Sequence, residues 1–218
     1  MPKNHALFRV GSNSSVGSFF GCNKPNGQEK PHVIGYQDEI VASNYHTVLA
    51  QREKTYAERQ TNNLGKLLAS IPFEVRTDNK KEFENGVIPW TVIESPEEDI
   101  PHLIDGNKIV VPKGKATLII DYPLTNRFYI DLESRKGLTR VQILRSVSKA
   151  YYKLYQEEEQ TATVKTIPIN ERITTYNRNQ TDGKYGIWGH DIADLVLAEV
   201  LLYRTSDGRI ILSLNMQS

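Results

Sequence analysis

The 218-residue chain carries 27 Lys and Arg against 26 Asp and Glu, so its formal net charge is only +1. The basic residues are spread along the sequence without a block of five like charges, which argues against a specific nucleic-acid partner. Cys22 is the one cysteine, which excludes an internal disulfide and a cysteine-based zinc site. The five histidines have no metal-ligand spacing, so we expect no metal and no cofactor.

The sequence also lacks signals of secretion and of membrane insertion. Its start, MPKNHALFRV, has no apolar segment of the kind found in signal peptides, and no run of about 18 apolar residues occurs. We therefore expect an intracellular, cytoplasmic protein with no membrane partner.

Residues 1–36 are rich in Gly, Ser, Asn and Pro and have few periodic apolar positions, which is typical of an extended arm. Phe19 and Phe20 form an apolar pair within this arm. They are candidate binding residues for another protein surface. The alternative is a short hydrophobic contact between the arm and its own domain.

Residues 37–72 have helix-forming composition and predict one long helix, or two helices with a break near Asn62 and Asn63. Apolar residues at spacings of 3, 4 and 7 form an approximate stripe, namely Ile40, Val41, Tyr45, Val48, Leu49 and Tyr56, continued by Leu64, Leu67, Leu68 and Ile71. Pro72 ends the stripe. We expect this helical segment to lie outside the core.

Residues 73–107 predict an irregular connector, with one short edge strand around Pro89, which cannot donate to a ladder. A compact α+β domain is expected over 108–218. Strands are indicated within 108–131, and the Asp207-Gly208 turn between apolar runs predicts a hairpin over 195–214. The expected fold is an antiparallel sheet packed on one main helix.

That helix is predicted over 138–160, where Thr139 and Gln142 form a capping-box pattern. Its apolar face consists of Val141, Leu144, Val147, Tyr151 and Leu154. Three glutamates at 157–159 lie near its C-terminus, where they oppose the helix dipole. Two interpretations remain: the helix end frays in solvent, which we favour, or another group neutralises the glutamates.

The segment TDGKYGIWGHDIADLVLAEV, residues 181–200, allows a catalytic interpretation. His190 and Asp194, four residues apart, would lie on one face of a helical turn and could pair as acid and base. Asp191 is a further candidate carboxylate, and Tyr185 and Trp188 would line a binding pocket. Neither a nucleophile nor a phosphate-binding glycine pattern accompanies them.

The structural interpretation of the same segment is the one we favour. Gly186 and Gly189 permit positive φ or close backbone approach. The aromatic residues supply large apolar area, and His190 or Asp191 can cap the following turn. Such a loop would fix the C-terminal hairpin against the main helix without any reaction.

Two blocks of the C-terminal half carry a resemblance. The first starts at Gly137-Leu138-Thr139-Arg140 and ends with Tyr152, Tyr155, Glu158 and Glu159; the second contains Gly183, Tyr185, Gly186, Ile187, Trp188, Gly189, His190, Asp194 and Leu195. These blocks resemble an uncharacterised domain family, associated with plants, algae, protists and large DNA viruses, that has a G-x-Y-G-I-W-G-H motif. Leu138 replaces the usual Phe, and the end of the first block matches inexactly. The resemblance covers roughly 116–214. It implies one structural unit in which an Arg, a backbone amide or His190 meets the glutamates, and it implies no activity.

Two functional hypotheses follow. The first is a non-enzymatic structural or assembly protein that binds other protein subunits of a large complex through its arm and helical segment. A minor capsid component, located in the virion, is one form of it, and a subunit of another large eukaryotic complex is another. The second is a small-molecule-binding domain or hydrolase-like enzyme that uses the GIWGHD loop. Burial of His190 favours the first, and an open cleft with converging carboxylates favours the second.

Overall fold

The structure is a computed structural model that describes residues 47, 50–52, 54, 55, 64–172 and 178–218. The chain divides into two units, Met1–Ile34 and Gly35–Ser218, and every described residue belongs to the second unit. Phe19, Phe20 and the rest of the predicted arm lie outside the described residues.

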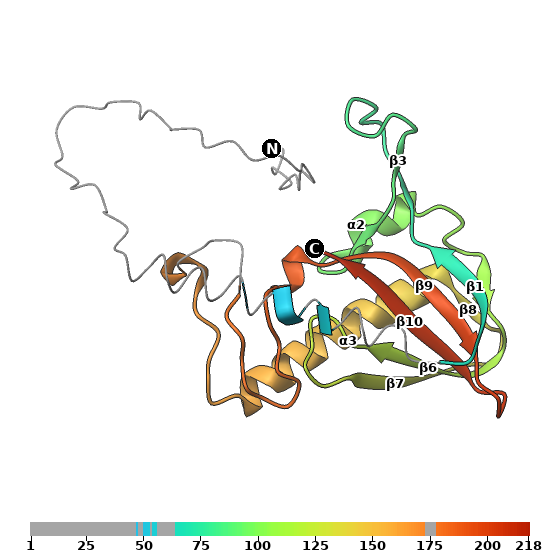
Figure 1. Ribbon diagram of the computed structural model, residues 1–218. Coiled ribbons are helices and arrows are strands. Elements are labelled where there is room, and N and C mark those ends of the chain that lie inside the picture. Colours follow the sequence, from blue (N-terminus) through green and yellow to red (C-terminus); the bar gives the residue numbers. More distant parts are fainter. Residues whose placement is uncertain (1–46, 48–49, 53, 56–63, 173–177) are drawn as a thin grey trace. The chain divides into compact units, whose positions relative to one another are not determined.

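The described part has the expected α+β fold, with the long helix α3 (Arg140–Thr161) on one face of a mainly antiparallel sheet (Figure 1). The strands of this main sheet, in spatial order, are β1 (Lys66–Pro72), β9 (Val196–Arg204), β10 (Ile210–Gln217), β6 (Gly114–Ile120) and β7 (Phe128–Ser134). A short sixth strand, β4 (Thr91–Val92), pairs with the start of β9. Among these pairs, β10 with β6 is parallel and the others are antiparallel.

The remaining elements are short and lie around this sheet. Two further strand pairs join β2 (Val75–Arg76) to β3 (Val87–Ile88) and β5 (Ile109–Val111) to β8 (Leu138–Thr139). The short helices are α2 (Pro96–Asp99), η1 (Ile100–His102), η2 (Ile169–Glu171) and η3 (Ile192–Asp194).

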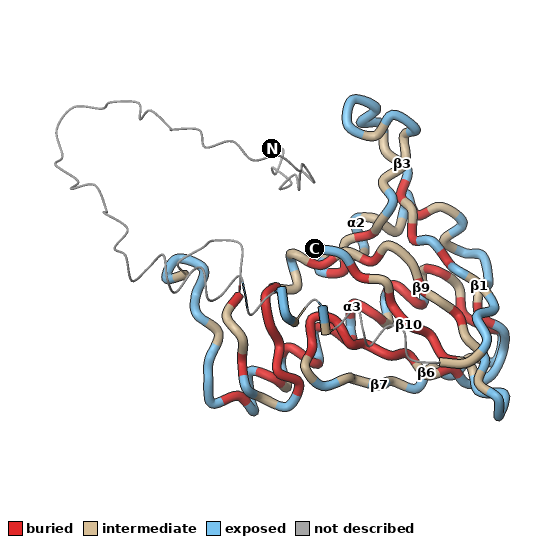
Figure 2. The backbone as a smooth tube through the Cα atoms, viewed as in Figure 1, coloured by how far each residue is buried: buried red, intermediate tan, exposed pale blue. Residues whose placement is uncertain are grey.

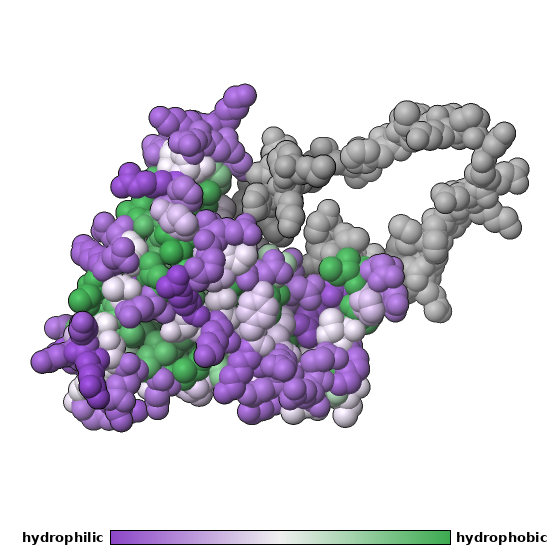
Figure 3. Space-filling model, turned by 180° about the vertical axis from the view of Figure 1, so that it is seen from behind, coloured by the Kyte–Doolittle hydropathy of each residue, from purple (hydrophilic) through white to green (hydrophobic). Residues whose placement is uncertain are grey.

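The hydrophobic core lies between α3 and one face of the main sheet (Figure 2). Strand register aligns Leu118, Leu212 and Leu202 in one row across β6, β10 and β9. Because side chains alternate along a strand, the row points to one face, and all three leucines are buried in one cluster with Val147 and Tyr151 of α3. Hydrophilic residues cover most of the face shown in Figure 3.

The predicted main helix is confirmed, including its start. The Thr139 hydroxyl accepts a hydrogen bond from the Gln142 amide at 3.2 Å, and the Thr139 amide donates to the Gln142 side chain at 2.9 Å. These two bonds form the capping box that the sequence predicts. The C-terminal hairpin is confirmed as β9 and β10, with Gly208 at a φ of 86° in its turn.

The prediction of a helix through residue 72 is wrong, because Lys66–Pro72 is strand β1, paired with β9. Residues 47, 50–52, 54 and 55 are helical, and the rest of the predicted helix before residue 64 lies outside the described residues. Gly65, at a φ of 107°, precedes the strand. A bulge between Leu67 and Ala69 shifts the alternation of side chains, so the leucine spacing imitates a helix.

The prediction of an irregular connector over 73–107 is also wrong. Phe73, Val75, Ile93 and Leu103 belong to the core cluster, so the core includes residues of the segment expected to be a connector. The expected edge strand is split into β3 and β4, which lie in different sheets. Single apolar residues separated by polar turns leave no periodic pattern, although each of them packs on the same core.

Candidate functional site

The carboxylate of Glu158, in the last turn of α3, is enclosed by the segment that follows residue 180. Glu158 has no exposed surface. Its Oε1 accepts from the Thr181 hydroxyl at 2.6 Å and the Gly183 amide at 2.9 Å. Its Oε2 accepts from the amides of Tyr185 at 2.7 Å and Gly186 at 3.2 Å. A buried carboxylate is stable only when its oxygens are paired in this way.

These bonds keep Glu158 ionised. Burial by itself would raise the pKa of its carboxyl, but the hydrogen bonds from Thr181 and the three amides hold that pKa below its usual value. The favoured prediction of a frayed helix end is therefore wrong. Hydrogen bonds from backbone amides stabilise the negative charge of one of the three glutamates, as the second interpretation allowed.

Close approach of the backbone makes this arrangement possible at Gly183. A β-carbon at this position would lie 2.7 Å from the Glu158 carboxyl group and 2.8 Å from the Glu158 carbonyl oxygen. Gly186 has a φ of 61° and Gly189 a φ of 74°, the left-handed values that the sequence predicts. The glycines therefore allow the loop to wrap around a side chain.

Further polar contacts fix the loop to the end of α3. Glu157 accepts from Lys184 Nζ at 2.8 Å and from the Tyr185 hydroxyl at 2.5 Å, and these partners lower its pKa to about 2. Asp182 accepts from the amides of Thr163 at 2.8 Å and Val164 at 2.7 Å. The loop and the residues after α3 therefore form one unit.

His190 is buried beside Tyr122, and the residue as a whole is 8% exposed. Its Nε2 lies 2.7 Å from the Tyr122 hydroxyl and 3.4 Å from Ser218 Oγ. Its backbone carbonyl accepts from the Tyr155 hydroxyl at 2.7 Å. Burial lowers the pKa of His190 to about 4, so the ring is neutral near pH 7.

Asp191 and Asp194, the candidate carboxylates, are engaged elsewhere. Asp191 forms a two-pronged ion pair with Arg172, with distances of 2.6 and 3.2 Å. Asp194 accepts from the Asp191 amide at 2.8 Å, and the two residues form a capping box in which Asp191 is the N-cap of η3. Among the described residues, the partners of the His190 ring are Tyr122 and Ser218, so the structure does not bring His190 and Asp194 together as an acid–base pair.

Tyr185 and Trp188, the candidate binding residues, lie inside the domain. Each is 3% exposed. The Trp188 ring packs edge-on against Tyr122 at a centroid distance of 5.3 Å, and Tyr185 packs edge-on against Phe128 at 5.2 Å. In this structure both rings fill the core and neither lines an open surface.

Four contributors to this cluster were not identified from the sequence: Tyr122, Tyr155, Arg172 and Ser218. Tyr155 was part of the resemblance, but without a role. Each lies far along the chain from residue 190 or on another element, and single Tyr, Arg and Ser residues carry no spacing pattern. The aspartate before Tyr122 and the proline after it, in IIDYP, mark only the end of a strand.

No cluster of three or more His, Cys, Asp or Glu residues suited to a metal occurs in the part of the chain that the structure describes. Within the same residues, none of the helices has the length and apolar character needed to cross a membrane. Comparison of the chain with models of known families, with curated proteins and with solved structures found no match.

Proposed function

We propose that this protein is a non-enzymatic assembly subunit that binds other protein subunits of a larger complex. The observation that carries the proposal is strand β1, which lies at the edge of the described main sheet. Leu67 and Leu68 on this strand are 50% and 39% exposed. An exposed edge strand with apolar side chains is a template for pairing with a strand of another protein.

The state of the GIWGHD loop also supports this proposal over a catalytic role. Its carboxylates are paired with Arg172 or with backbone amides, and its aromatic rings are packed in the core. A catalytic site needs groups that can meet a substrate. These groups stabilise the domain instead.

The predicted arm and the helical segment complete the proposal as further elements that contact partners. Phe19 and Phe20 remain the proposed contact residues of the arm. We include a minor capsid component as one form of such a subunit on the sequence resemblance of the C-terminal half alone.

The proposal can be tested by the size of the particle that contains the protein in native extracts of its source cells. We expect the wild-type chain to migrate in a complex far larger than a monomer. The double substitution Leu67→Lys and Leu68→Lys should release it as a monomer. Ile109→Lys with Ile169→Lys is the matched control, because these residues are 55% and 58% exposed on other elements. A wild-type monomer in the extract would contradict the proposal.

One observation favours the enzymatic alternative. Ser218 Oγ lies 3.4 Å from His190 Nε2 and 2.9 Å from the Tyr122 hydroxyl. A serine hydroxyl beside a histidine nitrogen is the arrangement of a nucleophile and its general base. A fluorophosphonate probe distinguishes the two proposals. Covalent labelling of Ser218 that His190→Gln abolishes would support a hydrolase, and an unlabelled serine at full probe excess would exclude one.

A further inference from the structure

Basic residues from separate parts of the sequence gather at one end of the main sheet. The register aligns Lys66 on β1 with Arg204 on β9. Arg209 and Lys115 directly precede the residues of β10 and β6 that continue this row. The connections before β6 and after β7 supply the others. We call this set the basic rim: Lys66, Lys113, Lys115, Arg135, Lys136, Arg204 and Arg209.

The basic rim is an exposed charged surface. All seven side chains are exposed. Asp207 and Glu133 are the acidic residues on the same strand ends and turns, which leaves a local net charge of +5. The whole chain has a net charge of only +1, so the rest of it is net negative. Of the rim residues, Arg209 alone forms an ion pair within the described part of the chain, with Asp207.

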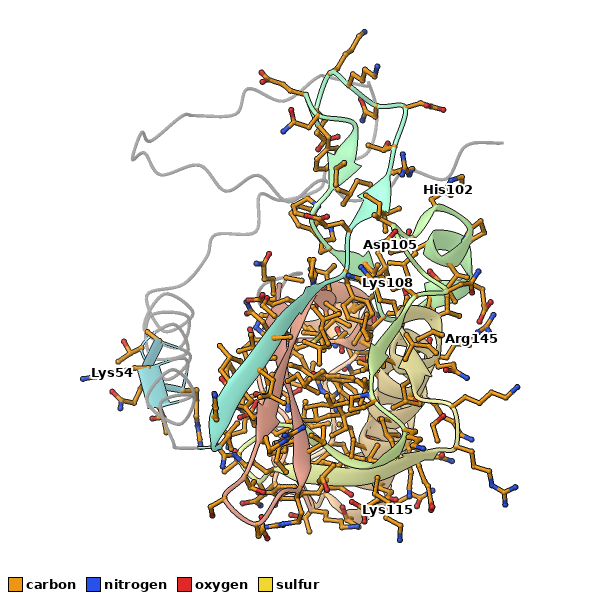
Figure 4. All side chains as sticks on the ribbon, turned by 90° about the vertical axis from the view of Figure 1, so that its right-hand side faces the viewer. Lys54, His102, Asp105, Lys108, Lys115 and Arg145 are labelled. Atoms are coloured by element: carbon orange, nitrogen blue, oxygen red, sulfur yellow. The ribbon has the colours of Figure 1, made fainter. Side chains whose placement is uncertain are left out.

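Three turn tips form this end. The backbone of two of them is open at Gly114 and Gly208, whereas Gly137 in the third is buried against the Val111 carbonyl. The tips are Pro112–Gly114, Arg135–Gly137 and the hairpin turn around Asp207-Gly208. A β-carbon added at Gly114 or Gly208 would meet nothing within 4 Å. A large anion can therefore approach both the basic side chains and the main chain. Figure 4 shows Lys115 at the lower edge of the sheet, pointing away from the domain.

We propose that the basic rim binds the phosphate backbone of duplex nucleic acid without reading its sequence. Neighbouring strands are about 4.8 Å apart, so five strands place the rim residues along about 19 Å. A B-form duplex presents roughly eleven phosphate charges over the same axial length. A row of fixed cations facing this array gains affinity from the release of condensed counterions.

The side chains at the tips distinguish duplex nucleic acid from other anionic partners. The tips carry no aromatic residue on which unpaired bases could stack and, apart from Pro112, no apolar side chain that could insert into a lipid surface. The turn tips offer mainly charge, which fits a partner whose binding is mainly electrostatic.

The test is fluorescence anisotropy of the full-length chain with a labelled 20-base-pair duplex at salt concentrations from 50 to 200 mM. We expect two unrelated duplex sequences to bind equally, with affinity falling steeply as salt rises. The substitution pair Lys115→Gln and Lys136→Gln should weaken binding about tenfold at 50 mM salt and reduce the slope of log affinity against log salt by about two.

The matched control is Lys80→Gln with Lys81→Gln, which removes the same charge from the exposed connection between β2 and β3. This control should bind like the wild type. The proposal is overturned if the rim variant binds like the wild type or if no duplex binding occurs at 50 mM salt. Tighter binding to polyglutamate or to phosphatidylserine vesicles than to the duplex would also overturn it.

Discussion

Glu158 and Lys115 are both charged side chains at the end of a helix or strand, but they differ in burial and in the number of hydrogen bonds that they form. Glu158 is fully buried and receives four hydrogen bonds from the loop that encloses it. Lys115 is exposed and belongs to a row of cations that face solvent. The charged groups near the GIWGHD loop form hydrogen bonds and ion pairs within the domain. The charged side chains of the basic rim face solvent, where a binding partner can reach them.

The comparison teaches that crowding of polar residues in a sequence does not by itself indicate an open surface. The GIWGHD loop is the most chemically diverse stretch of the chain, and its polar groups are engaged inside the domain. The basic rim is inconspicuous in the sequence, because its residues are separated by up to about 140 positions. They come together only through the register of the strands.

The largest expected effect is the loss of the buried carboxylate. Glu158→Ala leaves three amides without their acceptor and leaves the Thr181 hydroxyl only its longer contact with the Ile187 carbonyl, so the free energy of unfolding should fall by about 3–5 kcal/mol. Urea denaturation measures this change. Two controls sharpen the comparison, because Glu159→Gln at the exposed neighbouring position and Lys115→Gln in the basic rim should each change stability by less than about 0.5 kcal/mol. A loss below about 1 kcal/mol in Glu158→Ala would contradict the structural role of the carboxylate.

The next effect is a pH dependence that arises from His190. Its folded-state pKa of about 4 lies below the ordinary value of 6.5, so between these values the unfolded chain binds a proton that the folded chain excludes. Acidification through this window therefore destabilises the folded state, by up to about 3 kcal/mol from this group. Stability above pH 6.5 is unaffected by it.

The measurement is urea denaturation of the wild type and of His190→Gln at a series of pH values from 7 to 4. Carboxylates titrate in both proteins, so the difference between their unfolding free energies isolates the histidine. This difference should shrink or reverse in favour of the variant as the pH falls. A difference that stays constant across the window would show that His190 can be protonated in the folded protein.

The smallest expected effects on stability come from replacing one glycine near the GIWGHD loop and one glycine at the basic rim. Gly183→Ala places a methyl group against the Glu158 carboxyl and should cost about 2 kcal/mol through steric displacement. Gly208→Ala meets no atom within 4 Å but has a φ of 86°, so it should cost about 1 kcal/mol through backbone strain. Thermal denaturation of both variants tests the order, and a more damaging Gly208→Ala would show that the loop can move away from Glu158.

Elements with strong local signals could be predicted from the sequence. Thr139 and Gln142 predicted the start of α3, and Asp207-Gly208 predicted the hairpin, because each signal depends only on residues that are neighbours in the chain. Strand β1 could not be predicted, because its bulge removes the alternation that identifies a strand and its partner β9 lies about 130 residues away. The same holds for Phe73 and Ile93, which reveal their burial only once the sheet and helix are assembled.

The sequence directed attention to the loop residues but not to the partners that they have in the structure. The role of the loop glycines followed from residue type, and the possibility of a backbone amide meeting a glutamate came from the resemblance. The pairing of His190 with Tyr122, and of Asp191 with Arg172, depends on side chains that the fold brings from other elements. A spacing of four residues suggested that His190 and Asp194 pair, but His190 precedes η3 in a segment without a continuous helical turn.

The bulge in β1 has a consequence for growth by strand addition. The strand pairs in unbroken register only over Lys66–Leu67 and Ala69–Pro72, and its last residue lacks an amide hydrogen. Each stretch is shorter than the five or six residues of an ordinary strand. A bound strand would have to match this interruption, which selects one register. A bulged edge of this kind can accept a single matching partner strand while resisting the indefinite edge-to-edge pairing of strands that leads to fibres.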